Sequence, residues 1–181
     1  MSEQAWLPYG RQTITSADEK AVLDCLRGDF LTQGPAVPAF ETALADACQS
    51  PHAVAFSSAT SALHAACLAL GLGPGDRLWT SPISFVASAN CGLYCGATVD
   101  FVDIDPSTAL MSLPLLERRL KEAELDGSLP KVVVPVHLVG TSCPMAELSQ
   151  LADRYGFRIL EDASHAVGAS YDDAPVGSGH Y

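Results

Sequence analysis

Short apolar runs alternate along this chain with longer segments in which apolar residues recur at helical spacing. The runs that this pattern predicts as strands are Ala53–Phe56, Arg77–Thr80, Thr98–Val102, Lys131–Val136 and Arg158–Leu160. The segments between them that it predicts as helices are Ser61–Leu70, Phe85–Cys95, Pro114–Glu124 and Met145–Tyr155. Several of the runs are rich in Val and Ile and are bounded by Gly, Pro or Asp, which is typical of buried parallel strands. The alternation predicts an α/β fold in which helices cover both faces of an open, mostly parallel sheet.

Two further helices are expected ahead of the first strand. The segment Ser16–Glu19 fits a capping box, in which the Ser16 hydroxyl accepts a hydrogen bond from the Glu19 amide. This helix is expected to end at Gly28, and the next to cover roughly Val37–Cys48. No repeat, low-complexity tract or flexible linker interrupts the chain, so no internal domain boundary is expected.

The end of the sequence carries a different signal. Residues Asp172–Tyr181 read as a hairpin turn that leads into another strand. A finished domain seldom stops at such a point, and we therefore expect the chain to be cut off inside its fold.

Composition narrows the classes of function. Of the 181 residues, 48% are hydrophobic and 17% are charged, which is enough apolar material to form a core. The formal net charge of -11 argues against binding to nucleic acid or to an anionic membrane, because no basic surface is available. Apolar runs such as Leu63–Leu72 are too short to span a bilayer, and the first residues lack the pattern of a signal peptide. A cytoplasmic protein is expected.

The six cysteines do not suggest a disulfide framework or a metal site. They contain no C-x-x-C pair, and no two His residues lie near them at the spacing of zinc ligands. We interpret all six as small hydrophobic side chains of the core.

Candidate chemistry lies in the segments that follow the predicted strands, because ligands of open α/β sheets bind beyond the carboxyl ends of the strands. Ser57–His64 follows the first strand and is rich in small hydroxylated residues. At a helix N-terminus, such a turn leaves backbone N–H groups that favour a phosphate, although an ordinary Ser or Thr cap has the same pattern. Neither a P-loop nor a dinucleotide fingerprint is present, so a phosphate monoester suits this turn better than a nucleotide tail.

Two other strand ends carry further candidates. Phe85 is expected to begin a helix after the second strand, where its ring could cover a planar ligand or join the core. Asp162 directly follows the fifth strand and could hold a protonated ring nitrogen through a charge-assisted hydrogen bond. His165, three residues later, could hydrogen-bond Asp162 or another ring substituent. The plainer alternative makes Asp162 a helix cap and His165 a core imidazole. Together, a phosphate turn, an aromatic cover and an acid for a pyridine nitrogen are the parts that pyridoxal 5'-phosphate requires.

The sequence resembles the sugar aminotransferases of the DegT/DnrJ/EryC1/StrS family, which have the fold-type-I architecture of pyridoxal-phosphate enzymes. The segments that carry the resemblance are Leu31–Pro35, Ser58–His64, Val102–Asp105, Pro135–Gly140 and Glu161–Asp162. Within the family, the segments most similar to the pseudaminic-acid branch are Ser58–Leu63, Thr80–Ala87 and Asp162–Gly168. The resemblance implies a three-layer large domain that binds the cofactor, with residues 1–181 as its N-terminal portion. It also implies that the rest of this domain and a small C-terminal domain are absent.

The resemblance implies a role for each candidate residue. Asp162 would pair with the ring nitrogen of the cofactor and His165 would lie near its hydroxyl group, which makes these two the expected catalytic residues. The other cofactor-binding residues would be Ala59, Thr60 and Phe85, with the phosphate at the first two and the ring stacked on Phe85. The residues that would line the sugar-nucleotide site are Tyr9, Asp29, Phe30, Leu31, Thr32 and Ala59. The implied substrates are a UDP-linked 4-keto-6-deoxy-N-acetylhexosamine and L-glutamate, and the implied assembly is a homodimer.

One departure from the family matters more than these matches. The family's Schiff-base lysine lies beyond Tyr181, and none of Lys20, Lys121 and Lys131 corresponds to it. We therefore expect the 181-residue chain, expressed alone, to aggregate or to be inactive. Two alternatives remain open: a non-catalytic sugar-nucleotide-binding relic, and a relative with another nucleotide-linked sugar as substrate. That relative could also be a dehydratase in which a His replaces the lysine, a role for which His180 is a poor match.

Overall fold

The computed structural model describes residues 12–179, which form two compact units where the sequence predicted no internal boundary. The first unit ends at Phe40 and the second begins at Glu41. Helix α1 (Ser16–Arg27) belongs to the first unit, and helix α2 (Ala36–Cys48) begins in the first and continues into the second. Within the described range, no helix is long and apolar enough to cross a membrane.

The N-cap of α1 is Thr15, and the prediction of Ser16 was wrong by one residue. The Thr15 amide donates to Asp18 Oδ2 at 2.7 Å, and the Asp18 amide donates to Thr15 Oγ1 at 3.4 Å. The capping box is therefore Thr15–Asp18. The sequence allowed either pair, because Thr15 and Ser16 are both followed three positions later by an acidic residue. These hydrogen bonds from the Thr15 backbone and hydroxyl lower the pKa of Asp18. The helix ends before Gly28, as predicted.

The second unit contains the sheet and the helices around it. Its helices after α2 are α3 (Ala59–Ala69), α4 (Ala87–Tyr94), α5 (Leu113–Asp126), the short 3-10 helix η1 (Leu138–Gly140) and α6 (Met145–Tyr155). Its strands are β1 (Arg77–Thr80), β2 (Thr98–Phe101), β3 (Val132–Val134), β4 (Arg158–Ile159), β5 (Ser170–Tyr171) and β6 (Ala174–Pro175).

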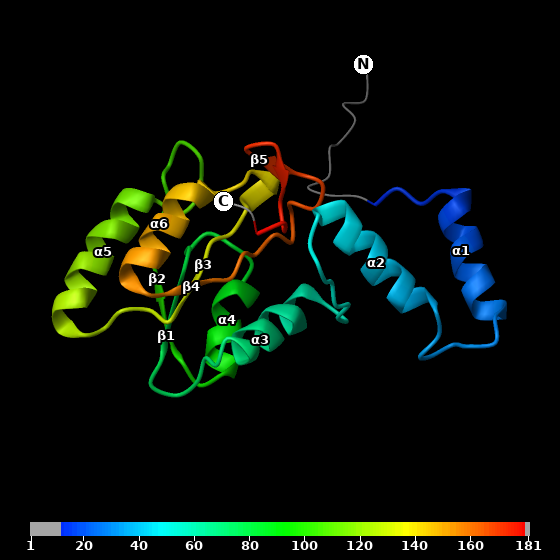
Figure 1. The fold of residues 1–181 in the computed structure, drawn as a ribbon, viewed down its shortest axis with the longest axis horizontal. Helices are drawn as coiled ribbons and strands as arrows, with labels where there is room; N and C mark the ends of the chain where they lie inside the picture. The colour runs from blue at the N-terminus through cyan, green and yellow to red at the C-terminus, as the bar shows by residue number, and fades with distance from the viewer. Residues whose placement is uncertain (1–11, 180–181) are drawn as a thin grey trace, which may run out of the picture. The chain divides into compact units, whose positions relative to one another are not determined.

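Strands β1 to β4 form one parallel sheet in the order β2-β1-β3-β4. Because side chains alternate along a strand, neighbouring residues enter different cores. Trp79 and Val133 pack with residues of α5 and α6, whereas Leu78, Val132 and Val134 pack with residues of α3 and α4. The sheet is therefore the middle of three layers, with α5 and α6 on one face and α3 and α4 on the other (Figure 1). This confirms the predicted α/β class with a parallel sheet.

The predicted strand Ala53–Phe56 is not formed. These residues have no assigned secondary structure and make no ladder with any described strand. Val54 is 68% exposed and Phe56 is 47% exposed. A β-strand forms only when its backbone is hydrogen-bonded to a neighbouring strand, and an apolar run in the sequence does not show whether such a neighbour is present.

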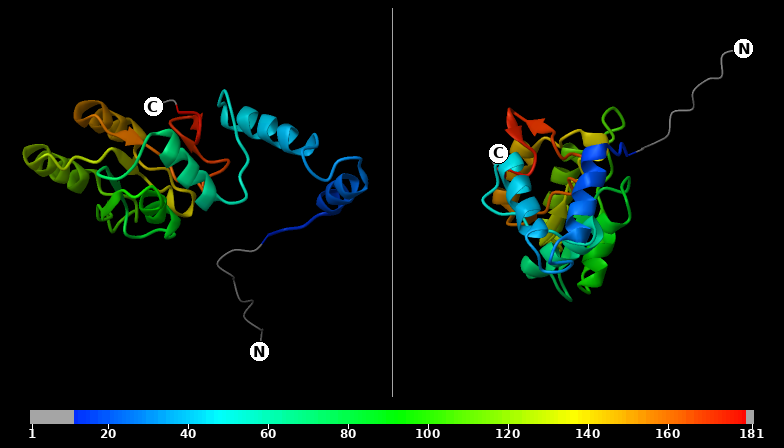
Figure 2. Two further views of the ribbon diagram at one scale, coloured as in Figure 1. Left: turned by 90° about the horizontal axis from the view of Figure 1, so that it is seen from below. Right: turned by 90° about the vertical axis from the view of Figure 1, so that its right-hand side faces the viewer.

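The predicted hairpin turn is confirmed. Asp172 and Asp173 have φ values of 46° and 65° and join the antiparallel strands β5 and β6. Two consecutive residues with positive φ are the signature of a type I′ turn, which Asp tolerates better than most residues. The hairpin is the red segment in both views of Figure 2.

The cysteines differ in burial. Cys67, Cys91, Cys95 and Cys143 are buried, as predicted, and Cys48 is half-buried. Cys25 is exposed, so its assignment to the core was wrong. It lies on α1, and none of the residues of that helix is buried.

Candidate active site

Asp162 follows β4 at the carboxyl edge of the sheet and is 6% exposed. Its backbone continues the β3–β4 pairing beyond the strands, because its amide donates to Pro135 O at 2.9 Å and its carbonyl accepts from the His137 amide at 3.1 Å. Both strand ends therefore hold the backbone from which the carboxylate projects.

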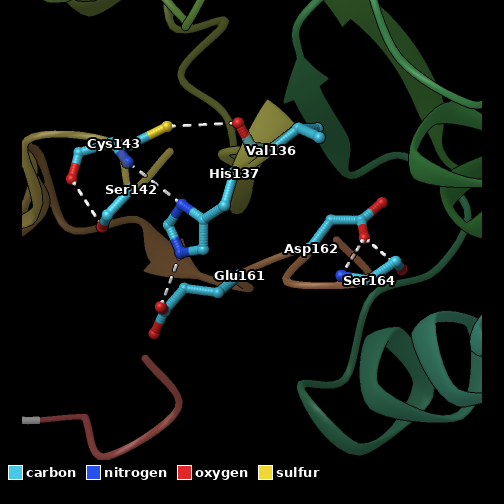
Figure 3. Close-up of polar contacts among 7 residues, drawn as sticks. All are labelled: Val136, His137, Ser142, Cys143, Glu161, Asp162 and Ser164. Atoms are coloured by element: carbon cyan, nitrogen blue, oxygen red, sulfur yellow. Dashed lines mark hydrogen bonds and ion pairs between the residues drawn. The ribbon is translucent and has the colours of Figure 1, made fainter. Parts of the chain in front are cut away.

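The Asp162 carboxylate has partners on both oxygens. Oδ2 accepts from the Ser88 hydroxyl at 2.6 Å. Oδ1 accepts from the Ser164 hydroxyl at 2.6 Å and from the Ser164 amide at 3.2 Å (Figure 3). An ionised carboxylate has about four acceptor positions. Among the described residues, the two bonds at Oδ1 and the one at Oδ2 leave a position at Oδ2 for one further donor.

Ser88 connects this carboxylate to the segment that follows β1. Its hydroxyl lies 2.9 Å from the Ser84 hydroxyl and 3.2 Å from Phe85 O. Phe85 was predicted to begin the helix, but α4 begins at Ala87 and Val86 is its N-cap. The Ser88 amide donates to Phe85 O, three residues back, so the chain forms a tight turn at Phe85 before the α-helix starts. The Phe85 side chain is 70% exposed, so within the described chain it is not part of the hydrophobic core.

The turn before α3 forms a capped helix N-terminus. The Ser61 amide donates to Ser58 Oγ and the Ser58 amide donates to Ser61 Oγ, both at 3.2 Å. The plain cap weighed in the sequence analysis is therefore present. Ala59 and Thr60 are the first two residues of the helix, and no acceptor among the described residues meets their amides. The cap thus leaves two N–H groups that an anion can use.

His165 does not form the hydrogen bond to Asp162 that the sequence suggested as one option. Its side chain is exposed, and the partners of Asp162 are Ser88 and Ser164. The core-imidazole alternative for His165 is also excluded by this exposure. The backbone of His165 is close-packed against Gly140, where an added Cβ would lie 3.1 Å from His165 O.

Sequence reasoning missed four residues of this site: Ser88, Ser164, His137 and Glu161. Ser164 had a local signal, because an Asp followed two residues later by Ser is a common side-chain-to-backbone turn. His137 and Glu161 lie in segments that carry the family resemblance, but neither they nor Ser88 had a local signal for these contacts. Their contacts join segments that are distant in the sequence, such as His137 Nε2 with Glu161 Oε2 at 2.9 Å.

Of the predicted sugar-nucleotide residues, Asp29, Phe30, Leu31 and Thr32 lie in the first unit, whereas Ala59 begins α3 in the second. Asp29 and Phe30 line an apolar groove between α1 and α2, together with Cys25 and Ala36. Leu31 and Thr32 are exposed in the loop that joins the two helices. Tyr9 lies outside the described residues.

Each of the three lysines pairs with an acidic residue other than Asp162. Lys20 pairs with Asp24 on α1, and Lys121 pairs with Glu117 on α5 at 2.8 Å. The Lys131 ammonium precedes β3 and contacts Asp76 Oδ2 at 2.8 Å and Gly71 O at 2.6 Å, at the amino edge of the sheet. This contact lowers the pKa of Asp76.

A buried carboxylate and a turn with an exposed aromatic ring follow strands of the parallel sheet at its carboxyl edge, which is where open α/β sheets bind their ligands. The DegT/DnrJ/EryC1/StrS aminotransferase family matches residues 12–180. The chain belongs to this family.

Three relatives illustrate the match. The spore coat polysaccharide biosynthesis protein SpsC of Bacillus subtilis is 38% identical over 96% of this chain and 43% of its own length. The UDP-4-amino-4-deoxy-L-arabinose–oxoglutarate aminotransferase of Shewanella sediminis is 34% identical over 95% of this chain and 43% of its own. The GDP-perosamine synthase of Caulobacter vibrioides is 38% identical over 98% of this chain and 47% of its own length. The chain thus spans less than half the length of these relatives.

Solved structures agree with the fold. The Helicobacter pylori aminotransferase PseC, involved in the biosynthesis of pseudaminic acid, superposes with a TM-score of 0.84 at 33% identity, over 93% of this chain and 44% of its own. The sugar aminotransferase Spr1654 of Streptococcus pneumoniae, in its PLP-form, superposes with a TM-score of 0.84 at 30% identity. The superposition covers 94% of this chain and 46% of that protein. The family and this neighbour indicate pyridoxal 5'-phosphate as the cofactor. The open acceptor position at Asp162 Oδ2 fits a protonated ring nitrogen.

Proposed function

We propose that this chain is part of an aminotransferase that transfers an amino group from L-glutamate to C4 of a UDP-linked 4-keto-6-deoxy-N-acetylhexosamine, a step of pseudaminic-acid biosynthesis. The observation that carries the proposal is the buried Asp162 carboxylate with one acceptor position left at Oδ2. Family membership supports the reaction class, and the similarity to PseC supports the sugar.

The residues of the second unit have distinct tasks in this proposal. Asp162 holds the proton on the ring nitrogen, and Ser88 and Ser164 hold the carboxylate in one orientation. The amides of Ala59 and Thr60 bind the phosphate, helped by the positive end of the α3 dipole. The exposed ring of Phe85 covers the pyridine face. When bound, the cofactor supplies an electron-withdrawing ring that stabilises negative charge at the carbon that loses a proton.

His165 lies near the ring hydroxyl of the cofactor in this proposal, because it follows Asp162 on the same loop and its side chain is exposed. Tyr9, Asp29, Phe30, Leu31 and Thr32, together with Ala59, contact the sugar nucleotide. The name of the Shewanella relative includes oxoglutarate, which supports glutamate as the donor. A different nucleotide-linked sugar is the second candidate, and the similarity to GDP-perosamine synthase favours it.

The complete enzyme requires parts that this chain does not supply. We propose that residues 1–181 form the N-terminal portion of a cofactor-binding large domain in a homodimer, and that the Schiff-base lysine belongs to another part of the protein. The support is the position of Lys121 and Lys131 away from Asp162 and the match to less than half of each relative. A cytoplasmic location fits the six cysteines, which are all free thiols.

The cofactor site can be tested on the complete protein by fluorescence titration with pyridoxamine 5'-phosphate. We expect saturable binding that Asp162→Asn weakens at least about tenfold, since an amide does not provide a charged partner for the ring nitrogen. Asp153→Asn on α6 is the matched control. Equal affinity of the wild type and Asp162→Asn would refute the role of Asp162.

The reaction is tested in two steps. Sequencing the DNA beyond the Tyr181 codon in the same frame shows whether a lysine follows, and the product of the complete frame is then assayed with a panel of UDP- and GDP-linked 4-keto sugars. We expect glutamate-dependent amination of the UDP-linked N-acetylhexosamine by that product and none by the 181-residue chain. Amination by the short chain would refute the proposed need for an external lysine, and a genuine stop codon would favour the non-catalytic relic.

A further inference from the structure

His137 is fully buried and uses both ring nitrogens. Nδ1 accepts a hydrogen bond from the Cys143 amide at 3.1 Å, and Nε2 lies 2.9 Å from Glu161 Oε2. A backbone N–H can only donate, so Nδ1 carries no proton. The proton is therefore on Nε2, which donates to the Glu161 carboxylate, and the two contacts select a single tautomer of the neutral ring.

These contacts join two loops at the carboxyl edge of the sheet (Figure 3). His137 lies three residues beyond the end of β3, and Glu161 lies beyond the end of β4 and directly before Asp162. The same loops meet again where Gly140 packs against His165 O, and Gly140 has a φ of +85° that favours glycine. One loop is thus held against the other on both sides of Asp162, at Glu161 and at His165.

We propose that His137 is a positioning residue that acts through Glu161 on Asp162 and His165, and this inference rests on the proposed function. The His137–Glu161 hydrogen bond fixes the backbone next to Asp162, and that backbone sets the direction of the carboxylate toward the ring nitrogen. Apolar side chains could fill the same volume, but they would not select one loop geometry. A fully satisfied polar pair does so because any shift of the loop leaves a buried group unpaired.

Two substitutions separate the contacts of the ring. His137→Gln carries an amide nitrogen at about the reach of Nε2 and can still donate to Glu161. His137→Asn can still accept from the Cys143 amide but does not reach Glu161. Glu161→Ala removes the acceptor and leaves the fully buried ring of His137 in place, and the Glu161 side chain is 17% exposed. His52→Gln, at an exposed histidine of the same unit, is the control.

The experiment measures the affinity of the complete protein for pyridoxamine 5'-phosphate, its urea unfolding and the ¹⁵N spectrum of its imidazoles. We expect the spectrum to report a proton on Nε2 of His137. We expect His137→Asn and Glu161→Ala to weaken binding about tenfold, and His137→Gln to recover most of the loss. A purely structural role would change the unfolding midpoint and leave the affinity of the folded protein unaltered.

Asp162→Asn, measured beside these variants, separates the two proposals. If it leaves the affinity unchanged, the proposed function fails. If it weakens binding whereas Glu161→Ala and His137→Asn do not, or if the proton is on Nδ1, the positioning role alone is overturned.

Discussion

The Ser88 hydroxyl donates a 2.6 Å hydrogen bond to Asp162 Oδ2 across 74 positions of sequence. Ser88 lies in α4, which follows β1, and Asp162 follows β4, two strands away in the sheet. The bond therefore ties the helix on one face of the sheet to the loop that presents the carboxylate.

We expect Ser88→Ala to destabilise the chain by about 1–3 kcal/mol, because Asp162 then loses a buried donor. The Asp162 side chain keeps its two bonds from Ser164, so the loss is limited to Oδ2. Urea unfolding measures the effect. Ser84→Ala, which removes a half-buried neighbour without a direct bond to Asp162, is expected to cost less. Equal costs for the two variants would contradict a special role for the Ser88 bond.

The packing of α4 against the sheet depends on Gly92. A Cβ at this position would lie 2.9 Å from Val99 Cγ2 and 3.1 Å from Leu78 Cβ. We expect Gly92→Ala to lower the free energy of unfolding by about 1–3 kcal/mol, because α4 must move away from β1 and β2. Gly73→Ala is the control, since no atom lies within 4 Å of its added Cβ. A neutral Gly92→Ala would show that the helix can shift without loss of packing.

The thiols should differ in reactivity. Cys25 is exposed, whereas burial raises the pKa of Cys143 to about 12. Since the reagent must reach the thiol and only Cys25 is exposed, we expect Cys25 to react with Ellman's reagent on the order of a hundredfold faster than the four buried thiols. Cys25→Ser should remove the fast phase, and urea should expose the remaining thiols. Fast reaction of Cys67, Cys91, Cys95 or Cys143 in the folded protein would contradict their burial.

The Lys131–Asp76 ion pair predicts a dependence of stability on pH. The hydrogen bond from Lys131 lowers the pKa of Asp76 below its usual 3.8, so folding favours the ionised carboxyl. Its stabilisation is present above the unfolded-state pKa and is lost as the pH falls through the lower folded-state pKa. We expect the stability difference between the wild type and Asp76→Asn to be constant above about pH 5 and to shrink toward pH 2. Lys131→Met should reduce the same difference, and a difference that grows on acidification would contradict the assignment.

Local pattern was sufficient for most of the helices and strands. Helix α6 begins and ends at the predicted residues, Met145 and Tyr155, and β1 matches Arg77–Thr80. The spacing of apolar residues shows which side of a segment is buried, and the period of that spacing distinguishes a helix from a strand. The same pattern wrongly predicted a strand at Ala53–Phe56, because a strand also needs a pairing partner, which apolar spacing does not identify.

The sequence by itself determined the α/β class, and it identified Asp162 as a carboxylate at the carboxyl edge of the sheet, because the alternation of strands and helices along the chain and the polar residues that follow the strands are local features. Only the tertiary structure decided what surrounds this carboxylate. Ser88 reaches it across 74 positions, and His137 reaches Glu161 across 24. Such pairs depend on which strands are neighbours and in which register they pair, and hydrophobic periodicity contains neither quantity.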